Sequence, residues 1–248
     1  MLKVLEHALA SWRSANPYVA ESAADERTKN PLAQALVCTI AGLGLLLLGF
    51  LLDGQVARIL TLRSSNIWRS LAIYSSKAGE GWVIAVVGAT ISLLLLLLRR
   101  FRASRAVFLV ALTGLLTGFA ATIMRSLLGR TRPDSHEIQG FYGVWHHAHW
   151  IFGKYEFGAF PSGHAATVIG LATAAWLIDR RFGVLAAGYA ALVCWSRIAL
   201  GCHHFSDTIA AGILGIYGAR LVLRRWGYFG EAKVNCRPQS ISAGPDPH

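Results

Sequence analysis

The chain has 248 residues, of which 54% are hydrophobic and 15% are charged, and its formal net charge is +11. This composition excludes an ordinary soluble domain, in which about a quarter of the residues are charged. The charged residues lie between long apolar runs, as in a protein that crosses a membrane several times. The basic residues are spread over several loops, so their charge indicates membrane topology and anionic lipids, and no nucleic-acid partner is expected.

Six apolar runs predict an all-α fold, a six-span transmembrane helical bundle. The first run, residues 32–52, carries no charge and is long enough to cross a hydrocarbon core. The other five runs are residues 82–98, 106–124, 160–178, 182–200 and 205–223. We therefore expect a cytoplasmic N-terminal tail at residues 1–31, a six-span domain at 32–225 and a disordered cytoplasmic C-terminal tail at 226–248.

The basic residues of the short loops predict the orientation. Arginines lie between the second and third runs and between the fourth and fifth, and basic residues follow the sixth run. With six spans these segments share one side with the amino terminus, and the positive-inside rule makes that side cytoplasmic. Residues 1–30 are polar, so we expect no cleavable signal peptide, and the first run should stay as an anchor in the cytoplasmic (inner) membrane.

Two outer segments each allow two interpretations. Apolar residues recur at helical spacing from residue 55 to 77, which predicts either a helix lying in the outer interface or a packed extramembrane helix. Eight aromatic residues between 134 and 160 predict either an aromatic belt at headgroup level or a lid over a headgroup pocket. Within that segment His146, His147 and His149 are spaced like metal ligands, but no acid or cysteine accompanies them in the sequence, so metal binding is disfavoured.

Three short motifs lie at the outer ends of the later runs. Arg125 and Arg132-Pro133 follow the third run, and arginines bind phosphate in a bidentate manner. Basic residues that flank a span are ordinary, but a basic cluster on the outer side is unusual and indicates an anionic ligand. Pro161-Ser162-Gly163-His164 opens the fourth run, where a helix N-terminus can bind an anion. The Ser162 hydroxyl and the Gly163 N–H can donate to phosphate oxygens, and His164 can act as a general acid; a plain helix cap is the simpler reading.

The third motif contains Ser196, Arg197, His203 and Asp207. If residues 203–207 are helical, His203 and Asp207 share a face, and the carboxylate can hold one imidazole nitrogen protonated while the other attacks phosphorus. His204 competes for the same carboxylate, and a structural capping pair is the alternative. The six-span topology brings all three motifs to one outer face, and this coincidence favours a phosphoryl-transfer enzyme.

The three motifs resemble the signature of the type 2 phosphatidic acid phosphatase family, which is Lys-x6-Arg-Pro, Pro-Ser-Gly-His and Ser-Arg-x5-His-x3-Asp. The second and third motifs match fully, and the first has Arg125 where the family usually has lysine. That exchange keeps the charge but changes the donor geometry, which should alter headgroup fit and spare the chemistry. The resemblance covers residues 32–223.

The resemblance implies a role for each residue. His203 attacks phosphorus to form a phosphohistidine, Asp207 orients it, and His164 protonates the leaving alkoxide and later activates water. The residues implied to bind the phosphoryl oxygens are Arg125, Arg132, Ser162, Gly163 and Arg197. Three arginines already supply the positive charge that Mg²⁺ provides elsewhere, and the one carboxylate of the motifs is committed to His203, so no metal or cofactor is expected.

We therefore expect a lipid phosphatase that acts at the outer (periplasmic) face of the inner membrane. Phosphatidylglycerol phosphate, phosphatidic acid, undecaprenyl diphosphate and lipid A phosphates are all compatible substrates, and the oligomeric state is left open. The alternatives are a lipid phosphotransferase that uses the same phosphohistidine, a family member that acts on a water-soluble ester, and a non-catalytic anion or lipid transporter. The transporter is disfavoured because the first three runs have almost no polar residues to form a path.

Overall fold

The computed structural model describes residues 31–62 and 66–226, with side chains from residue 36 onward. The two expected tails lie almost wholly outside the described residues. Within the described part, seven α-helices and a small hairpin follow one another along the chain. They are α3 (Pro31–Leu60), α4 (Ile67–Ala78), α5 (Gly81–Leu97), α6 (Phe101–Leu128), β1 (Trp145–His146), β2 (His149–Trp150), the 3-10 turn η1 (Tyr155–Phe157), α7 (Gly163–Ile178), α8 (Arg180–Ala199) and α9 (Phe205–Arg225).

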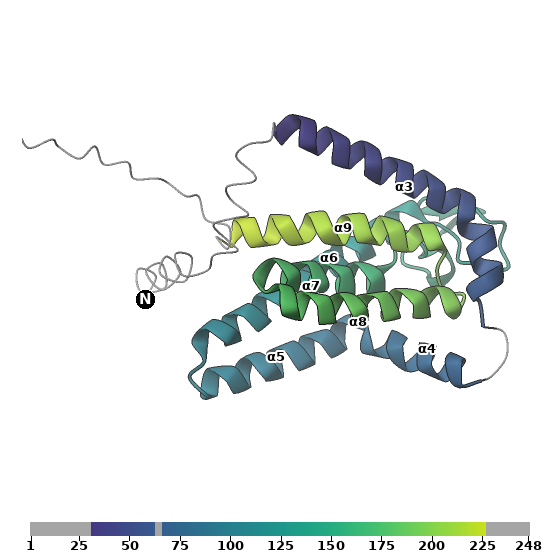
Figure 1. The fold of residues 1–248 in the computed structure, drawn as a ribbon. Helices are drawn as coiled ribbons and strands as arrows, with labels where there is room; N and C mark the ends of the chain where they lie inside the picture. The colour runs from purple at the N-terminus through teal and green to yellow at the C-terminus, as the bar shows by residue number, and fades with distance from the viewer. Residues whose placement is uncertain (1–30, 63–65, 227–248) are drawn as a thin grey trace, which may run out of the picture.

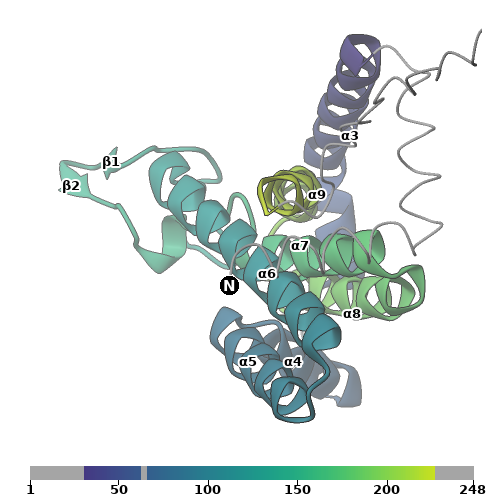
Figure 2. The same ribbon diagram turned by 90° about the vertical axis from the view of Figure 1, so that its left-hand side faces the viewer.

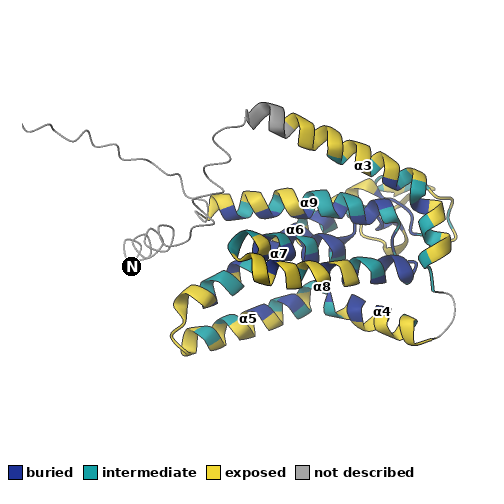
Figure 3. Ribbon diagram, in the orientation of Figure 1, coloured by how far each residue is buried: buried dark blue, intermediate teal, exposed yellow. Residues whose placement is uncertain are grey.

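Helix α7 lies at the centre of the bundle and packs against α6, α8 and α9 (Figures 1 and 2). Helix α5 packs on α6, α4 on α8, and α3 on α9. Figure 3 shows that the buried residues concentrate on the central helices, whereas α3 and α5 are exposed along most of their length. Exposed apolar side chains on outer helices are expected where lipid replaces water as the surrounding medium.

Small residues let α7 approach its neighbours closely. A Cβ atom on Gly170 would lie 2.2 Å from Thr117 Oγ1 of α6, and one on Gly215 of α9 would lie 2.9 Å from the Gly170 nitrogen. Helices that meet at such distances gain van der Waals contact between backbones, which is the main source of helix association in a membrane. The same positions explain why α7 is buried on three sides.

The all-α class and the transmembrane character agree with the prediction. Four helices of the described part are long and apolar enough to cross a membrane: α6, α8, α9 and residues 36–60 of α3. Helices α4 and α5 form a fifth candidate only if they count as one span, because they meet at a bend of 62°. Helix α7 has 16 residues, about 24 Å at the usual rise, and is shorter than a hydrocarbon core of roughly 30 Å. The six-span count therefore stays a prediction.

The single helix expected over residues 55–77 is wrong in its boundaries. Helix α3 continues to Leu60, and α4 begins separately at Ile67. The Asn66 side chain caps α4 by accepting from the Arg69 N–H at 3.0 Å, and Arg69 donates to the Leu62 carbonyl at 2.6 Å. A helix cap and a tied-back basic side chain thus break what looks in the sequence like one amphipathic repeat.

Residues 129–162 form the α6–α7 loop, and its hairpin of β1 and β2 extends away from the helices (Figure 2). Gly129 ends α6 in the left-handed conformation, with φ of 61°, and its N–H donates to the Arg125 carbonyl at 3.2 Å. The Gly143 N–H donates to the Leu128 carbonyl at 3.1 Å, which ties the loop back to the helix end. The far end of the loop returns to the start of α7 and brings its carbonyl groups into the bundle.

Candidate active site

The three motifs meet at one end of the bundle. Arg125 lies in the last turn of α6 and Arg197 in the last turn of α8, while Ser162 caps α7. His203 lies in the short α8–α9 connection, and Asp207 lies in the first turn of α9. The structure therefore brings together every residue that the sequence assigned to the site, although they come from four helices and two loops.

His203 is almost completely buried, with 1% of its surface exposed. Its Nδ1 lies 2.8 Å from the Ala159 carbonyl oxygen. A carbonyl can only accept, so Nδ1 carries the proton and Nε2 carries the lone pair in the neutral imidazole. The Nε2 atom is buried and has no hydrogen-bond partner among the described residues. One nitrogen of His203 is thus fixed, and the other is left open to react.

The charges around His203 keep it neutral. Burial first, and then the positive charges of Arg197 and Arg132, lower the pKa of His203 well below its usual range. An imidazole of ordinary pKa is partly protonated near neutral pH and then has no lone pair to share. The environment of His203 therefore favours the neutral imidazole at neutral pH.

Asp207 contacts His203 less directly than the sequence suggested. The two residues are not on one helix, because α9 begins at Phe205, and Asp207 Oδ2 lies 3.6 Å from His203 Nδ1. Asp207 Oδ2 accepts from the His204 backbone N–H at 2.7 Å. The hydrogen bond that sets the tautomer of His203 comes instead from Ala159, and Asp207 lies beside it as a fully buried carboxylate.

His204 makes different contacts from His203. Its Nε2 lies 3.2 Å from the Thr131 carbonyl oxygen, and its backbone caps the start of α9. Burial first, and then the positive charge of Arg130, lower the pKa of His204 as well. His204 therefore holds the α6–α7 loop to α9, whereas His203 faces the arginines.

Arg130 and Asp53 complete a buried ion network that the sequence analysis did not assign to the site. Arg130 Nη1 donates to Asp207 Oδ1 at 2.5 Å and to Ser206 Oγ at 2.7 Å, and its Nη2 donates to Asp53 Oδ2 at 2.8 Å. Asp53 Oδ1 in turn accepts from the Ser206 backbone N–H at 2.8 Å. The arginine thus joins a carboxylate of α3 to the carboxylate beside His203.

Three aromatic rings surround the Arg130 guanidinium of this network. The Arg130 guanidinium carbon lies 4.8 Å from the ring centre of Phe50, 5.3 Å from that of Phe141 and 5.8 Å from that of Phe160. Cation–π contact of this kind is strongest where water is excluded. A signal for Asp53 did exist, since it is the one acidic residue between residues 31 and 60 and an ionisable residue in an apolar helix is a functional suspect.

Arg132 is held mainly by backbone carbonyls. Its Nε donates to Tyr155 at 2.7 Å and its Nη1 to Cys202 at 3.1 Å, and the guanidinium carbon lies 3.8 Å from the Tyr155 ring centre. Arg132 is 4% exposed. These contacts fix its position while its charge acts on His203.

Arg197 and Arg125 use fewer of their N–H donors in hydrogen bonds than Arg132 does. Arg197 Nη1 donates to Ser76 Oγ of α4 at 2.5 Å, and its buried Nε has no partner among the described residues. Arg125 is half-buried, and its Nη1 lies 3.5 Å from the point that a Cβ atom on Gly163 would occupy. The Arg125 guanidinium therefore lies next to the N-terminus of α7.

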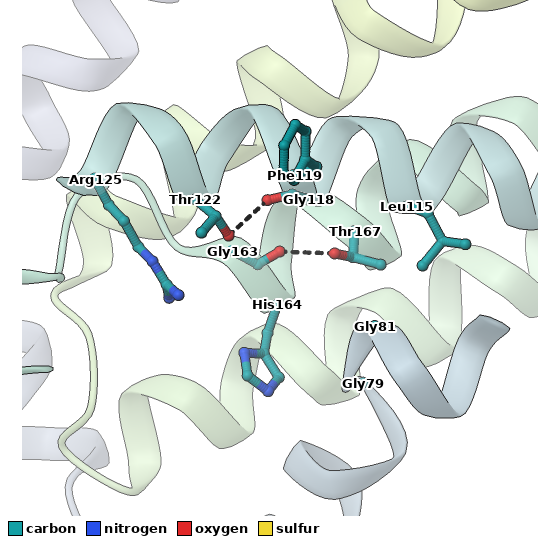
Figure 4. Close-up of a pocket in the computed structure, with 10 residues that line it drawn as sticks. All are labelled: Gly79, Gly81, Leu115, Gly118, Phe119, Thr122, Arg125, Gly163, His164 and Thr167. Atoms are coloured by element: carbon teal, nitrogen blue, oxygen red, sulfur yellow. Dashed lines mark hydrogen bonds between the residues drawn. The ribbon is translucent and has the colours of Figure 1, made fainter. Parts of the chain in front are cut away.

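His164 opens onto a cavity of about 240 Å³. The cavity lies between the α4–α5 bend, α6 and the first turn of α7, and Figure 4 shows Arg125 and His164 pointing to the same side of these helices. It is lined by Gly79, Gly81, Leu115, Gly118, Phe119, Thr122, Arg125, Gly163, His164 and Thr167. Ser162 caps α7 by accepting from the Ala165 N–H at 3.5 Å, which leaves its hydroxyl hydrogen free to donate.

The sequence was compared with models of known protein families. The model of the PAP2 superfamily matches residues 102–231, more than half of the chain, and the chain belongs to this superfamily. The resemblance to the type 2 phosphatidic acid phosphatases that the motifs indicated is thereby confirmed.

Two curated relatives are similar over part of their length. A lipid A 1-phosphatase of Rhizobium etli is 30% identical over 103 residues, which cover 42% of this chain and 43% of the relative. A lipid A 1-phosphatase of Rhizobium johnstonii is 33% identical over 105 residues, which cover 42% of this chain and 41% of the relative. The chain thus matches less than half of the length of these relatives.

Two solved structures share the fold. The crystal structure of Aquifex aeolicus LpxE has a TM-score of 0.51 at 16% identity, and the match covers 70% of this chain and 95% of that one. A PAP2-type phosphatidylglycerolphosphate phosphatase from Bacillus subtilis has a TM-score of 0.53 at 15% identity, with coverage of 78% and 98%. At these identities the likeness establishes the transmembrane helical fold.

Proposed function

We propose that the protein is an integral membrane phosphatase that removes a phosphate from a lipid through a phosphohistidine on His203. The observation that carries this proposal is the buried Nε2 of His203, which has no hydrogen-bond partner in the described part of the chain, while the opposite nitrogen is held by the Ala159 carbonyl. Nucleophilic catalysis needs a nucleophile that is reactive and held in orientation by a neighbouring group. The superfamily membership and the lipid A 1-phosphatase relatives support the same class of reaction.

The reaction has two steps. The lone pair of His203 Nε2 forms a bond to phosphorus while the bond from phosphorus to the lipid oxygen breaks, and His164 gives its proton to that oxygen. Water then attacks the phosphohistidine, His164 takes up the proton of the water, and phosphate leaves as the bond to Nε2 breaks. Arg125, Arg132 and Arg197, together with Ser162 and the Gly163 N–H, stabilise the charge on the equatorial oxygens, and no metal takes part.

Asp207 acts on the charged intermediate. Attack by Nε2 places a positive charge on an imidazole whose Nδ1 still carries its proton, and Asp207 lies 3.6 Å from that nitrogen. A carboxylate at this distance stabilises the intermediate more than the neutral starting imidazole, which is the requirement for catalysis. Arg130 and Asp53 keep this carboxylate in place through the buried ion network.

The substrate is a phosphorylated membrane lipid, and a lipid A phosphate is the first candidate because the curated relatives carry that name. The cavity next to His164 lies on the leaving-group side of the site and can take the part of the headgroup that carries the ester. Phe119 at its border is 65% exposed on the outer surface of α6, where lipid would lie. A lipid held in the outer leaflet of the inner membrane brings its phosphate to headgroup depth, so few residues are needed to position it.

Phosphate release from a panel of substrates tests this function. The purified protein in detergent is assayed with lipid A phosphates, phosphatidylglycerol phosphate, phosphatidic acid, undecaprenyl diphosphate and a short soluble phosphomonoester, with His203→Ala as the control. We expect kcat/KM to be highest for one of the lipids and turnover to vanish in the variant. Equal efficiency toward the soluble ester would overturn the lipid assignment and leave the chemistry intact, whereas no release from any substrate would refute the phosphatase.

Product analysis separates hydrolysis from transfer. With a phosphate-labelled lipid donor and an unlabelled lipid acceptor, hydrolysis places the label in free phosphate. Label in a second lipid instead would identify a phosphotransferase, which uses the same intermediate.

A further inference from the structure

The outer hairpin of the α6–α7 loop gathers a second set of ligand-type side chains away from the proposed active site. One donor atom each from Glu137, His146 and His147 lies within 4.8 Å of the other two. Glu137 Oε2 is 3.7 Å from His146 Nε2. In the sequence the histidines had no acidic partner nearby, but the fold brings Glu137 onto them from the preceding turn.

The hairpin holds the two imidazoles in an unusual arrangement. His147 and Ala148 form its turn with φ of 45° and 62°, a left-handed conformation that residues with a Cβ atom seldom adopt. The ring centres of His146 and His147 lie 3.9 Å apart, and the Tyr142 ring lies 3.9 Å from that of His146 on the same loop.

His146 also has a buried atom in need of a partner. Its Nε2 is shielded from solvent and makes no hydrogen bond to a described residue. A buried nitrogen without a partner costs free energy, and such a cost is commonly offset by a bound ion or water. An ion bound to this nitrogen could also be bound by the Glu137 carboxylate, which faces it.

We propose that Glu137, His146 and His147 form a binding site for one divalent transition-metal ion, with Zn²⁺ as the preferred ion. Two imidazole nitrogens and one carboxylate oxygen are a common ligand set for zinc, with a water in the fourth position. Ligand atoms around tetrahedral zinc are about 3.3 Å apart, so the donors must close in from the separations found here. Because His147 is exposed and Glu137 partly exposed, their side chains have room for this rotation.

The metal would secure the loop that supports the proposed active site. The hairpin contacts the returning segment through the His146 and Phe157 rings, whose centres are 5.7 Å apart. Next to Phe157, the segment supplies the Gly158 carbonyl to Arg132 and the Ala159 carbonyl to His203. The ion would stabilise this segment and take no part in the reaction itself.

Metal binding to the full-length protein in detergent tests the proposal without reference to activity. Chelator-treated protein is titrated with Zn²⁺ by calorimetry and with Co²⁺ by visible absorption, because tetrahedral Co²⁺ reports its ligands directly. The variants are Glu137→Gln and His146→Ala, and the matched control is His149→Ala, which removes an exposed imidazole from the same hairpin outside the set. Gel-filtration profiles show whether each variant is folded.

We expect one Zn²⁺ per wild-type chain, an unfolding temperature that rises with Zn²⁺, and an intense Co²⁺ spectrum. All three effects should be lost in His146→Ala and retained in His149→Ala, and the affinity for Zn²⁺ should fall at least tenfold in Glu137→Gln. Failure of the wild-type chain to bind Zn²⁺ would overturn the proposal. Equal binding by folded His146→Ala, or its loss in His149→Ala alone, would overturn the assignment of these ligands.

Discussion

Changing the charge of Arg130 should move the pH profile of the enzyme in a direction that is set by the buried ion network. Arg130 neutralises Asp207, whose carboxylate lies 3.6 Å from His203 Nδ1. In Arg130→Gln the carboxylate loses its counter-ion, and the pair of His203 and Asp207 should take up a proton at higher pH. In Asp53→Asn, Arg130 keeps its charge with one carboxylate fewer to balance it, and the apparent pKa of the pair should fall.

The size of the shift follows from Coulomb's law. The charge that Arg130→Gln removes lies 2.5 Å from Asp207 Oδ1, and two unit charges at that distance interact by about 6–7 kcal/mol at an effective dielectric constant of 20, which sets an upper bound of roughly five pKa units. The His204 N–H continues to stabilise the carboxylate in the variant, so we expect a net upward shift of about one unit. The other charged and titratable groups that face His203 remain in place: Arg125 of α6, Arg132 of the α6–α7 loop, His164 of α7 and Arg197 of α8.

The assay is kcat/KM against pH, whose acid limb reports the free enzyme. Burial already lowers the pKa of His203, so activity should persist below the pH at which an ordinary histidine is protonated. Arg130→Gln should move the acid limb to higher pH, Asp53→Asn should move it to lower pH, and Arg130→Lys should leave it near the wild-type position. Because removing one partner of a buried pair is destabilising by about 3–5 kcal/mol, the profiles are measured well below each unfolding temperature.

Gly49→Ala is the matched control for loosened packing. A Cβ atom there would lie 3.2 Å from the Ser206 Cα atom, so the change disturbs the same contact of α3 with α9 without removing a charge. We expect it to lower stability and leave the pH profile in place. If Arg130→Gln and Asp53→Asn shift the acid limb in the same direction, or if Gly49→Ala shifts it equally, the network does not act on the pair through its charge.

Three further predictions follow from the site. His203→Ala should abolish turnover because the nucleophile is lost, whereas His204→Ala should lower the unfolding temperature and retain activity in a phosphate-release assay; the reverse pattern would show that the register of the third motif is wrong. Activity measured well below the unfolding temperature of the metal-free protein should persist in excess EDTA and be inhibited by vanadate, a five-coordinate mimic of the transition state, and a complete loss in EDTA that Mg²⁺ restores would contradict the metal-free mechanism. Gly81→Leu should fill part of the cavity beside His164, since the nearest atom to a Cβ there is Leu115 Cδ2 at 3.7 Å; kcat/KM should fall about tenfold for a lipid substrate and stay unchanged for a short soluble ester, and equal losses on both would place the lipid elsewhere.

The class of fold was predicted from the sequence, and candidate residues for the site could be proposed from it, because both depend on local signals. Long apolar runs show where helices lie, and motifs at their ends identify side chains such as Arg197 and His203 by type and spacing. These residues do meet at one end of the bundle. The membrane orientation remains a prediction, since it rests on the basic loops alone.

The sequence could not show the hydrogen bonds and ion pairs that join distant segments of the chain. The partner of His203 Nδ1 is a backbone carbonyl 44 positions away, and a carbonyl has no residue type by which to recognise it. The pairing of Arg130 with Asp53 and the approach of Glu137 to His146 likewise arise from tertiary packing. The break between α3 and α4 was missed because the capping residue Asn66 lies inside a run that keeps helical spacing.

The bond between Asp53 and Arg130 also imposes an order on biosynthesis. Asp53 leaves the ribosome 77 residues before Arg130, so the first apolar helix enters the membrane with a carboxylate whose counter-ion has not yet been made. An unpaired acid near a membrane helix is unfavourable, and it gains its counter-ion only after α6 and the Arg130 segment behind it have been made. The last partner, the Ser206 N–H, arrives with α9. The hydrogen bonds of Asp53 are therefore complete only after α9, the last helix of the bundle in chain order, has been made.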